Sequence, residues 1–95
     1  MTQQEKINAN NIGLDGMLWQ TQEECGELVK AIGKYNRSRG VGQKTETSRQ
    51  EAFDNLAKEI ADVEICIRHI KYLLNIDTDN IQQEKIGKVY KRYNE

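Results

Sequence analysis

SRQEAFDNLAKEIADVEICIRHIKYLLN, residues 48–75, is the stretch that decides the fold. Apolar residues recur along it at intervals of three and four, which is the spacing of one face of an α-helix. They are Phe53, Leu56, Ile60, Val63, Ile67, Ile70 and Leu74. Ser48 and Glu51 form a capping-box pattern, in which each side chain satisfies a free backbone donor of the other residue. We therefore expect a long helix that begins after Ser48 and ends near Asn75.

Two further helices are expected on either side of this one. The first runs from about Asp15 to about Arg39 and ends at Gly40-Val41-Gly42, because glycine commonly follows the last turn of a helix. Its apolar or small positions, which alternate by three and four, are Leu18, Thr21, Cys25, Leu28, Ile32 and Tyr35. The other helix covers residues 79–93 and follows a cap at Asp77 or Thr78. Its inward-facing residues are expected to be Ile86, Val89 and Tyr93. The expected fold class is all-α, an antiparallel helical hairpin plus a C-terminal helix.

The chain should form one domain over residues 1–95, with a polar N-terminal arm or short helix at 1–13 and a loop at 40–47. The long second helix carries further apolar residues beside its main series, namely Ile65, Cys66 and Leu73. A hairpin with more than one apolar stripe rarely covers itself. We therefore expect a homodimer or homotetramer that is built as a bundle of four or more helices.

Composition limits the class of protein. Apolar residues make up 37% of the chain and are spread periodically, which argues against disorder. No apolar run approaches the ~20 residues of a membrane-spanning helix, and the polar start at residues 1–6 does not read as a secretory signal. The two cysteines are expected to be free thiols. These features predict a cytoplasmic protein without a membrane partner.

Basic residues are concentrated in two segments, although the net charge is −1. Residues 30–49 contain six cations opposed by one glutamate, and residues 85–92 contain four cations. Most of these side chains are explained individually as solvated surface. Acidic helix faces with basic residues near the ends also suit a metal-bound polyanion such as a nucleotide. The negative net charge argues against nucleic acid as the partner of the 30–49 segment.

Two acidic doublets are the main chemical signal in the sequence. Glu24 and Glu27 are three residues apart, as are Glu59 and Asp62, so each pair lies on one face of its helix. Both pairs lie beside the apolar series, and neither has a cation at i+4. Four converging carboxylates repel one another unless a cation neutralises them, and hard oxygen ligands suit Mg²⁺, with Mn²⁺ as a substitute. The alternative is that the doublets are only polar helix edges.

The same residues also resemble a known family. Trp19-Gln20 followed by Glu23-Glu24-Cys25-Gly26-Glu27-Leu28 is similar to the first motif of the MazG-like nucleoside triphosphate pyrophosphohydrolases, and residues 59–63 resemble their ExxD motif. Residues 31–37 and 85–92 also resemble stretches of small members, so that the similarity covers residues 17–93. The interval between the two motifs is slightly longer than is usual in the family, and we assign the excess to the loop at 40–47.

This resemblance implies Mg²⁺-dependent hydrolysis of a nucleoside or deoxynucleoside triphosphate between its α- and β-phosphates. The products would be a nucleoside monophosphate and pyrophosphate. The metal ligands implied are Glu24, Glu27, Glu59 and Asp62. Glu23 would be a further ligand or a base, although an exposed helix carboxylate is an equal alternative.

Substrate contacts are expected from two places. Trp19 and Gln20 precede the first doublet by one turn, where a base could stack and form hydrogen bonds, although tryptophan is more often a core or interface residue. Lys85, Lys88 and Arg92 share helical spacing and could neutralise phosphate charge.

Two alternatives stay open. Cys66 and His69 continue the acidic stripe and raise zinc as a minor possibility. A non-enzymatic helical oligomerisation or adaptor module is the alternative function.

Overall fold

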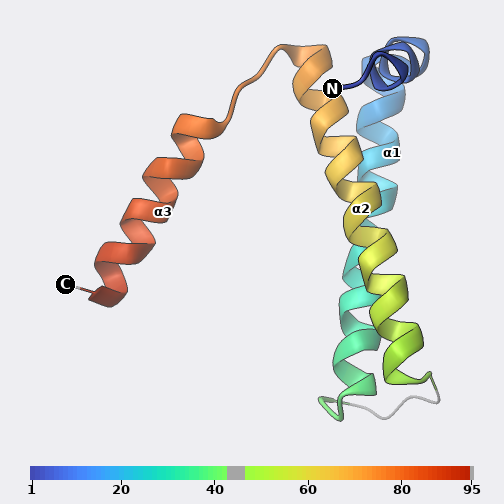
Figure 1. Cartoon of the computed structure of the whole chain (residues 1–95), viewed down its shortest axis with the longest axis vertical. Helices are drawn as coiled ribbons and strands as arrows, with labels where there is room; N and C mark the ends of the chain where they lie inside the picture. The colour runs from blue at the N-terminus through green and yellow to red at the C-terminus, as the bar shows by residue number, and fades with distance from the viewer. Residues whose placement is uncertain (43–46, 95) are drawn as a thin grey trace.

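The computed structural model describes residues 1–42 and 47–94, and over these residues it contains three α-helices and no strand (Figure 1). They are α1 (Gln3–Ser38), α2 (Arg49–Leu74) and α3 (Asp79–Asn94). The first two run antiparallel and pack along their length, whereas α3 projects from the end of α2 (Figure 1). The all-α class and the hairpin with a C-terminal helix are therefore confirmed. Of the expected loop at 40–47, residues 43–46 lie outside the described part of the chain.

The N-terminal residues form a helical segment that turns across α2. Thr2 and Glu5 make a complete capping box, in which Thr2 Oγ1 accepts from the Glu5 amide at 3.1 Å and Glu5 Oε2 accepts from the Thr2 amide at 2.9 Å. The helix is interrupted at Gly13, whose φ of 78° and ψ of 169° are accessible to glycine and strained for other residues. This turn brings residues 3–12 against the C-terminal end of α2 (Figure 1).

Helix α2 begins and ends where the sequence predicts. Ser48 Oγ accepts a hydrogen bond from the Glu51 amide at 3.2 Å, which satisfies one of the free donors of the first turn. Asn75 closes the helix in the left-handed conformation, at φ 53° and ψ 47°, and the Ile76 amide then donates to the Lys71 carbonyl at 2.9 Å.

The hairpin core is small and uses only part of the predicted apolar series. Within α2, Val63 is buried, while Leu56 and Ile70 are partly buried. The remaining four lie seven residues apart and are between 42% and 53% exposed: Phe53, Ile60, Ile67 and Leu74. The apolar face that this period predicts is therefore only partly covered in the single chain. We call these four residues the outer stripe, because they follow one line along α2 beside the contact with α1.

Helix α3 contributes nothing to this core. Asp77 caps it as predicted, since its Oδ1 accepts from the Asp79 amide at 2.9 Å. The predicted inward residues are all exposed, however, with Ile86 at 57%, Val89 at 49% and Tyr93 at 76%. The radius of gyration, 16.9 Å, exceeds the roughly 13 Å of a compact 100-residue domain. Over the described residues, none of the helices combines the length and apolar character needed to cross a membrane.

Candidate metal centre

Three of the four predicted metal ligands meet between α1 and α2. Glu24 comes from α1, and Glu59 and Asp62 come from successive turns of α2; each offers an oxygen, and these oxygens all lie within 4.8 Å of one another. The i,i+3 spacing on α2 places its two carboxylates on one face, and the antiparallel packing brings Glu24 opposite them. Glu24 and Glu59 are half-buried, and Asp62 is exposed. We call this group the acidic cluster.

The electrostatics of the acidic cluster favour a cation. Burial raises the pKa of Glu24, and the negative charges of Asp62 and Glu59 raise it further. Glu59 Oε2 is buried, and within residues 1–42 and 47–94 it has no hydrogen-bond partner. A buried carboxylate oxygen without a partner is costly, so a positively charged ligand would stabilise the group. Carboxylate oxygens are the ligands that Mg²⁺ and Mn²⁺ take in proteins.

The other two predicted acidic residues lie outside this group. Glu27 is exposed, and its Oε1 lies 3.5 Å from Lys30 Nζ on the same helix. Position i+4 from Glu27 is Ala31, and the cation lies at i+3 instead. Glu23 is also exposed on α1. The structure thus brings together Glu24, Glu59 and Asp62, and it leaves Glu23 and Glu27 on the surface near them.

The predicted substrate contacts are divided in the same way. Gln20 lines a pocket beside the acidic cluster, whereas Trp19 is 67% exposed and does not line that pocket. Lys85, Lys88 and Arg92 all lie on α3, which projects away from the hairpin (Figure 1). In the single chain, these three cations are not brought to the acidic cluster.

The pocket has a volume of about 330 Å³ and shares Glu24 and Asp62 with the acidic cluster. Its other walls come from the segment before Gly13, from α1 and from α2. The other polar side chains are Asn8, Asn11, Gln20 and His69, and the remaining lining residues are Ile12, Met17, Ile65 and Cys66. Asparagines 8 and 11 were not predicted, because their position depends on the turn at Gly13. The Thr2–Glu5 capping box was the one signal in the sequence that residues 3–12 are helical.

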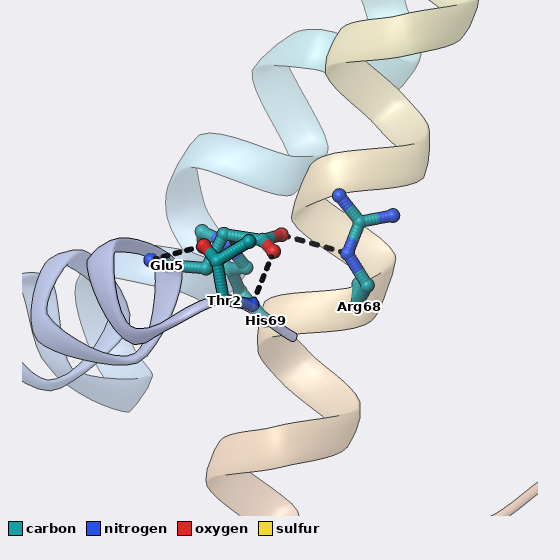
Figure 2. Close-up of polar contacts among 4 residues, drawn as sticks. All are labelled: Thr2, Glu5, Arg68 and His69. Carbon is teal, nitrogen blue, oxygen red and sulfur yellow. Dashed lines mark hydrogen bonds and ion pairs between the residues drawn. The ribbon is translucent and has the colours of Figure 1, made fainter.

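Glu5 links the segment before Gly13, which forms one wall of the pocket, to α2 (Figure 2). Arg68 Nε donates to Glu5 Oε1 at 2.7 Å, and His69 Nε2 lies 3.5 Å from the same oxygen. The hydrogen bond from the Thr2 backbone amide, together with the bond from Arg68, lowers the pKa of Glu5 to about 2. Asn10 Nδ2 donates to the Tyr72 hydroxyl at 3.1 Å, which adds a second attachment between the segment and α2.

The structure gives little support for zinc binding by Cys66 and His69. Cys66 and His69 are buried and line the pocket, but among the described residues they do not belong to a group of three ligand atoms. Burial raises the pKa of the Cys66 thiol, which disfavours the thiolate that a metal requires. Both cysteines are free, as the sequence predicts.

Comparisons with models of protein families, with curated proteins and with solved structures found no match to this chain. The function of the molecule is therefore inferred from its own residues and from the geometry of the acidic cluster and its pocket.

Proposed function

We propose that this chain is a divalent-metal-dependent hydrolase of nucleoside triphosphates. It would cleave ribo- or deoxyribonucleoside triphosphates between the α- and β-phosphates, giving a nucleoside monophosphate and pyrophosphate. One observation carries this proposal: three carboxylates from two helices converge, and one of them, Glu59, has a buried oxygen without a hydrogen-bond partner among the described residues. The similarity of residues 17–28 and 59–63 to the MazG-like motifs supports the choice of substrate and reaction.

The roles of the residues follow from their positions. Glu24, Glu59 and Asp62 would hold Mg²⁺ or Mn²⁺, and Glu27, one turn along α1 from Glu24, is the fourth ligand that we propose. When bound, the metal neutralises charge on the phosphate oxygens and lowers the pKa of a water molecule. Glu23 is exposed beside this group, and we assign it to accept a proton from the attacking water.

An oligomer is part of the proposal, because the single chain leaves two apolar surfaces uncovered. The outer stripe of α2 is one of them, and the apolar residues of α3 are the other. Packing between copies in a homodimer or homotetramer would bury both surfaces. It would also offer a route for Lys85, Lys88 and Arg92 to reach the phosphates bound to a partner.

A panel of nucleotides tests the proposed reaction. The full chain is incubated with each common ribo- and deoxyribonucleoside triphosphate, with Mg²⁺, with Mn²⁺ and with EDTA, and the products are separated chromatographically. We expect a monophosphate and pyrophosphate from at least one nucleotide, only when a metal is present. Release of orthophosphate and a diphosphate would contradict the assigned bond, and no cleavage of any nucleotide would contradict the function.

The second candidate is a non-enzymatic helical oligomerisation or adaptor module. The observation that favours it is α3, which presents exposed apolar residues and has no buried residue of its own. This reading accounts for the helices but leaves the unpaired Glu59 oxygen without a role. Metal-dependent pyrophosphate release separates the two candidates, because an adaptor would show none.

A further inference from the structure

A single residue separates the two helical parts of α1. Residues 3–12 and 14–38 are both helical, and only Gly13 departs from helical angles, with φ 78° and ψ 169°. If Gly13 took helical angles, α1 would run straight through this point and residues 3–12 would leave α2. Glycine adopts either conformation at little steric cost, and a Cβ at this position would meet nothing within 4 Å. The backbone of one residue therefore decides between a bent and a straight α1.

Few buried contacts hold the segment before Gly13 in its bent position. Within this segment, which the structure describes completely, Ala9 is the one buried residue, and both isoleucines are exposed. Its two hydrogen bonds to α2, from Arg68 to Glu5 and from Asn10 to Tyr72, are exposed to solvent (Figure 2). Parts of a protein with few buried apolar contacts and exposed hydrogen bonds open at a lower free energy than the core does. The segment should therefore leave α2 without unfolding of the hairpin.

The bent form also carries a cost at His69. Its imidazole is buried, and in the part of the chain that the structure describes neither ring nitrogen has a hydrogen-bond partner. Glu5, on the segment, places its carboxylate 3.5 Å from Nε2 (Figure 2). Buried polar groups are nearly always paired, and an unpaired one is costly. Movement of the segment would let water reach Nε2, so the unpaired imidazole reduces the advantage of the bent form over the straight one.

The segment before Gly13 forms one wall of the pocket beside the acidic cluster. Asn8, Asn11 and Ile12 line this wall. The three carboxylates of the acidic cluster come from α2 and from the part of α1 after Gly13. Straightening of α1 would therefore remove the wall and leave the acidic cluster in place.

We propose that the segment before Gly13 is a hinged cover of this pocket. In the bent form it closes one side of the pocket. In the straight form α1 is continuous through Gly13, and that side is open for a ligand to enter or leave. The inference rests on the proposed function only for the identity of this ligand, a nucleoside triphosphate. The hinge is a property of the chain and is tested without substrate.

Spin labels on the segment and on α2 distinguish the two forms. They are attached at Gln4→Cys and Glu64→Cys in a chain that carries Cys25→Ser, because Cys25 is exposed and Cys66 is buried. Pulsed electron paramagnetic resonance then gives the distribution of distances between the labels. Residue 4 lies ~14 Å along a helix from Gly13. The straight form should therefore appear as a separate population, with a distance more than about 10 Å longer than that of the bent form.

A matched pair of glycine variants tests the hinge. Gly13→Ala disfavours the bent form, because its positive φ is strained for alanine, and should raise the ratio of the long to the short distance about tenfold. Gly26→Ala is the control, since Gly26 lies in the regular part of α1 and an added Cβ would meet nothing within 4 Å. The control should leave the ratio unchanged. Equal ratios in the two variants would overturn the role of Gly13.

A second pair of variants tests the attachment to α2 and keeps the glycine. Arg68→Gln removes the guanidinium that donates to Glu5 and should raise the same ratio by about threefold to fivefold. Arg49→Gln removes an exposed cation at the opposite end of α2 and should leave it unchanged. If the short distance alone is found in the unmodified chain and in every variant, α1 does not straighten and the proposal is wrong.

Kinetics separate failure of the cover from failure of the proposed function. If the unmodified chain cleaves no nucleotide, the proposed function falls, and the distances still decide whether the hinge exists. With an active chain, Gly13→Ala should raise KM for the preferred nucleotide by about fivefold and keep kcat within about twofold, because the wall of the pocket is lost while the acidic cluster stays in place. An unchanged KM in a variant that shows the long distance would overturn the role of the segment as a cover.

Discussion

Glu59 is the residue of the acidic cluster whose surroundings bear most directly on metal binding. Its Oε2 is buried and has no hydrogen-bond partner among the described residues, and a buried carboxylate oxygen without a partner is costly. The spacing of the doublets was sufficient to predict Glu24, Glu59 and Asp62 as neighbours, because helical periodicity fixes which residues share a face. It could not predict that Glu27 turns toward Lys30, because rotation of a side chain about its own bonds is not fixed by the backbone.

Glu59→Gln should separate stability from metal binding. The amide keeps the shape of the side chain, removes one negative charge from the acidic cluster, and can donate to a neighbouring carboxylate. Stability without metal should therefore be equal or higher, by about 1 kcal/mol. The gain in Tm on adding Mg²⁺ should be reduced, because metal binding stabilises the folded state by mass action.

The control for this experiment is Glu64→Gln, which changes an exposed glutamate of α2 outside the acidic cluster. Its Tm should differ from that of the unmodified chain only slightly, with or without Mg²⁺. Thermal melts monitored by circular dichroism measure both quantities. Identical behaviour of the two variants would contradict the role given to Glu59.

Glu5 should contribute a pH-dependent part of the stability. Its pKa is lowered from 4.5 to about 2 in the folded chain, first by the Thr2 amide and then by Arg68. A lowered folded-state pKa stabilises the fold above the unfolded-state value, and this contribution is lost as the pH falls toward 2. Glu5→Gln should therefore be less stable than the unmodified chain at pH 7. Urea denaturation should show this difference shrinking between about pH 5 and about pH 2, and a constant difference would contradict the account.

Among the elements, the helices with strong end signals were the most predictable. Helix α2 begins after Ser48 and ends at Asn75, as expected, because caps act through local backbone geometry. For the segment at residues 3–12 the sequence allows either an arm or a short helix. Its polar sequence shows no apolar stripe, and its contacts with Arg68 and Tyr72 are distant in sequence. The pocket could not be predicted for the same reason.

Gly13 should control the position of that segment. Gly13→Ala places a side chain at φ 78° and ψ 169°, and this conformation should cost about 1–3 kcal/mol for a residue other than glycine. The matched control is Gly26→Ala, because Gly26 lies in the regular part of α1 and an added Cβ would have nothing within 4 Å. That variant should gain about 0.5–1 kcal/mol from its helix propensity. Urea denaturation compares the two, and equal effects would remove the special role of the turn.

At the scale of the whole molecule, the sequence predicted the hairpin but not the position of α3. The apolar residues of α3 satisfy the same pattern whether they pack on their own hairpin or on another chain. In the single chain they pack on neither α1 nor α2. The same holds for the outer stripe of α2, because periodicity identifies an apolar face and does not identify its partner.

The assembly should be visible in the mass of the protein in solution. Light scattering at micromolar concentration should give at least twice the chain mass of 11.0 kDa. Ile60→Lys places a charge in the outer stripe and should lower the measured mass, because burying an unpaired charge is costly. Val29→Lys makes the same kind of change at an exposed apolar residue of α1 and should leave the mass unchanged. A folded monomer at all concentrations would contradict the shared bundle.

Pyrophosphate release is the assay that tests whether the acidic cluster is a metal centre. The unmodified chain, Glu59→Gln and Glu64→Gln are assayed together, with the preferred nucleotide and with and without Mg²⁺. We expect metal-dependent release from the unmodified chain and from Glu64→Gln, and none above background from Glu59→Gln. Full activity of a folded Glu59→Gln protein, with the same Mg²⁺ dependence, would show that the acidic cluster is not the metal centre.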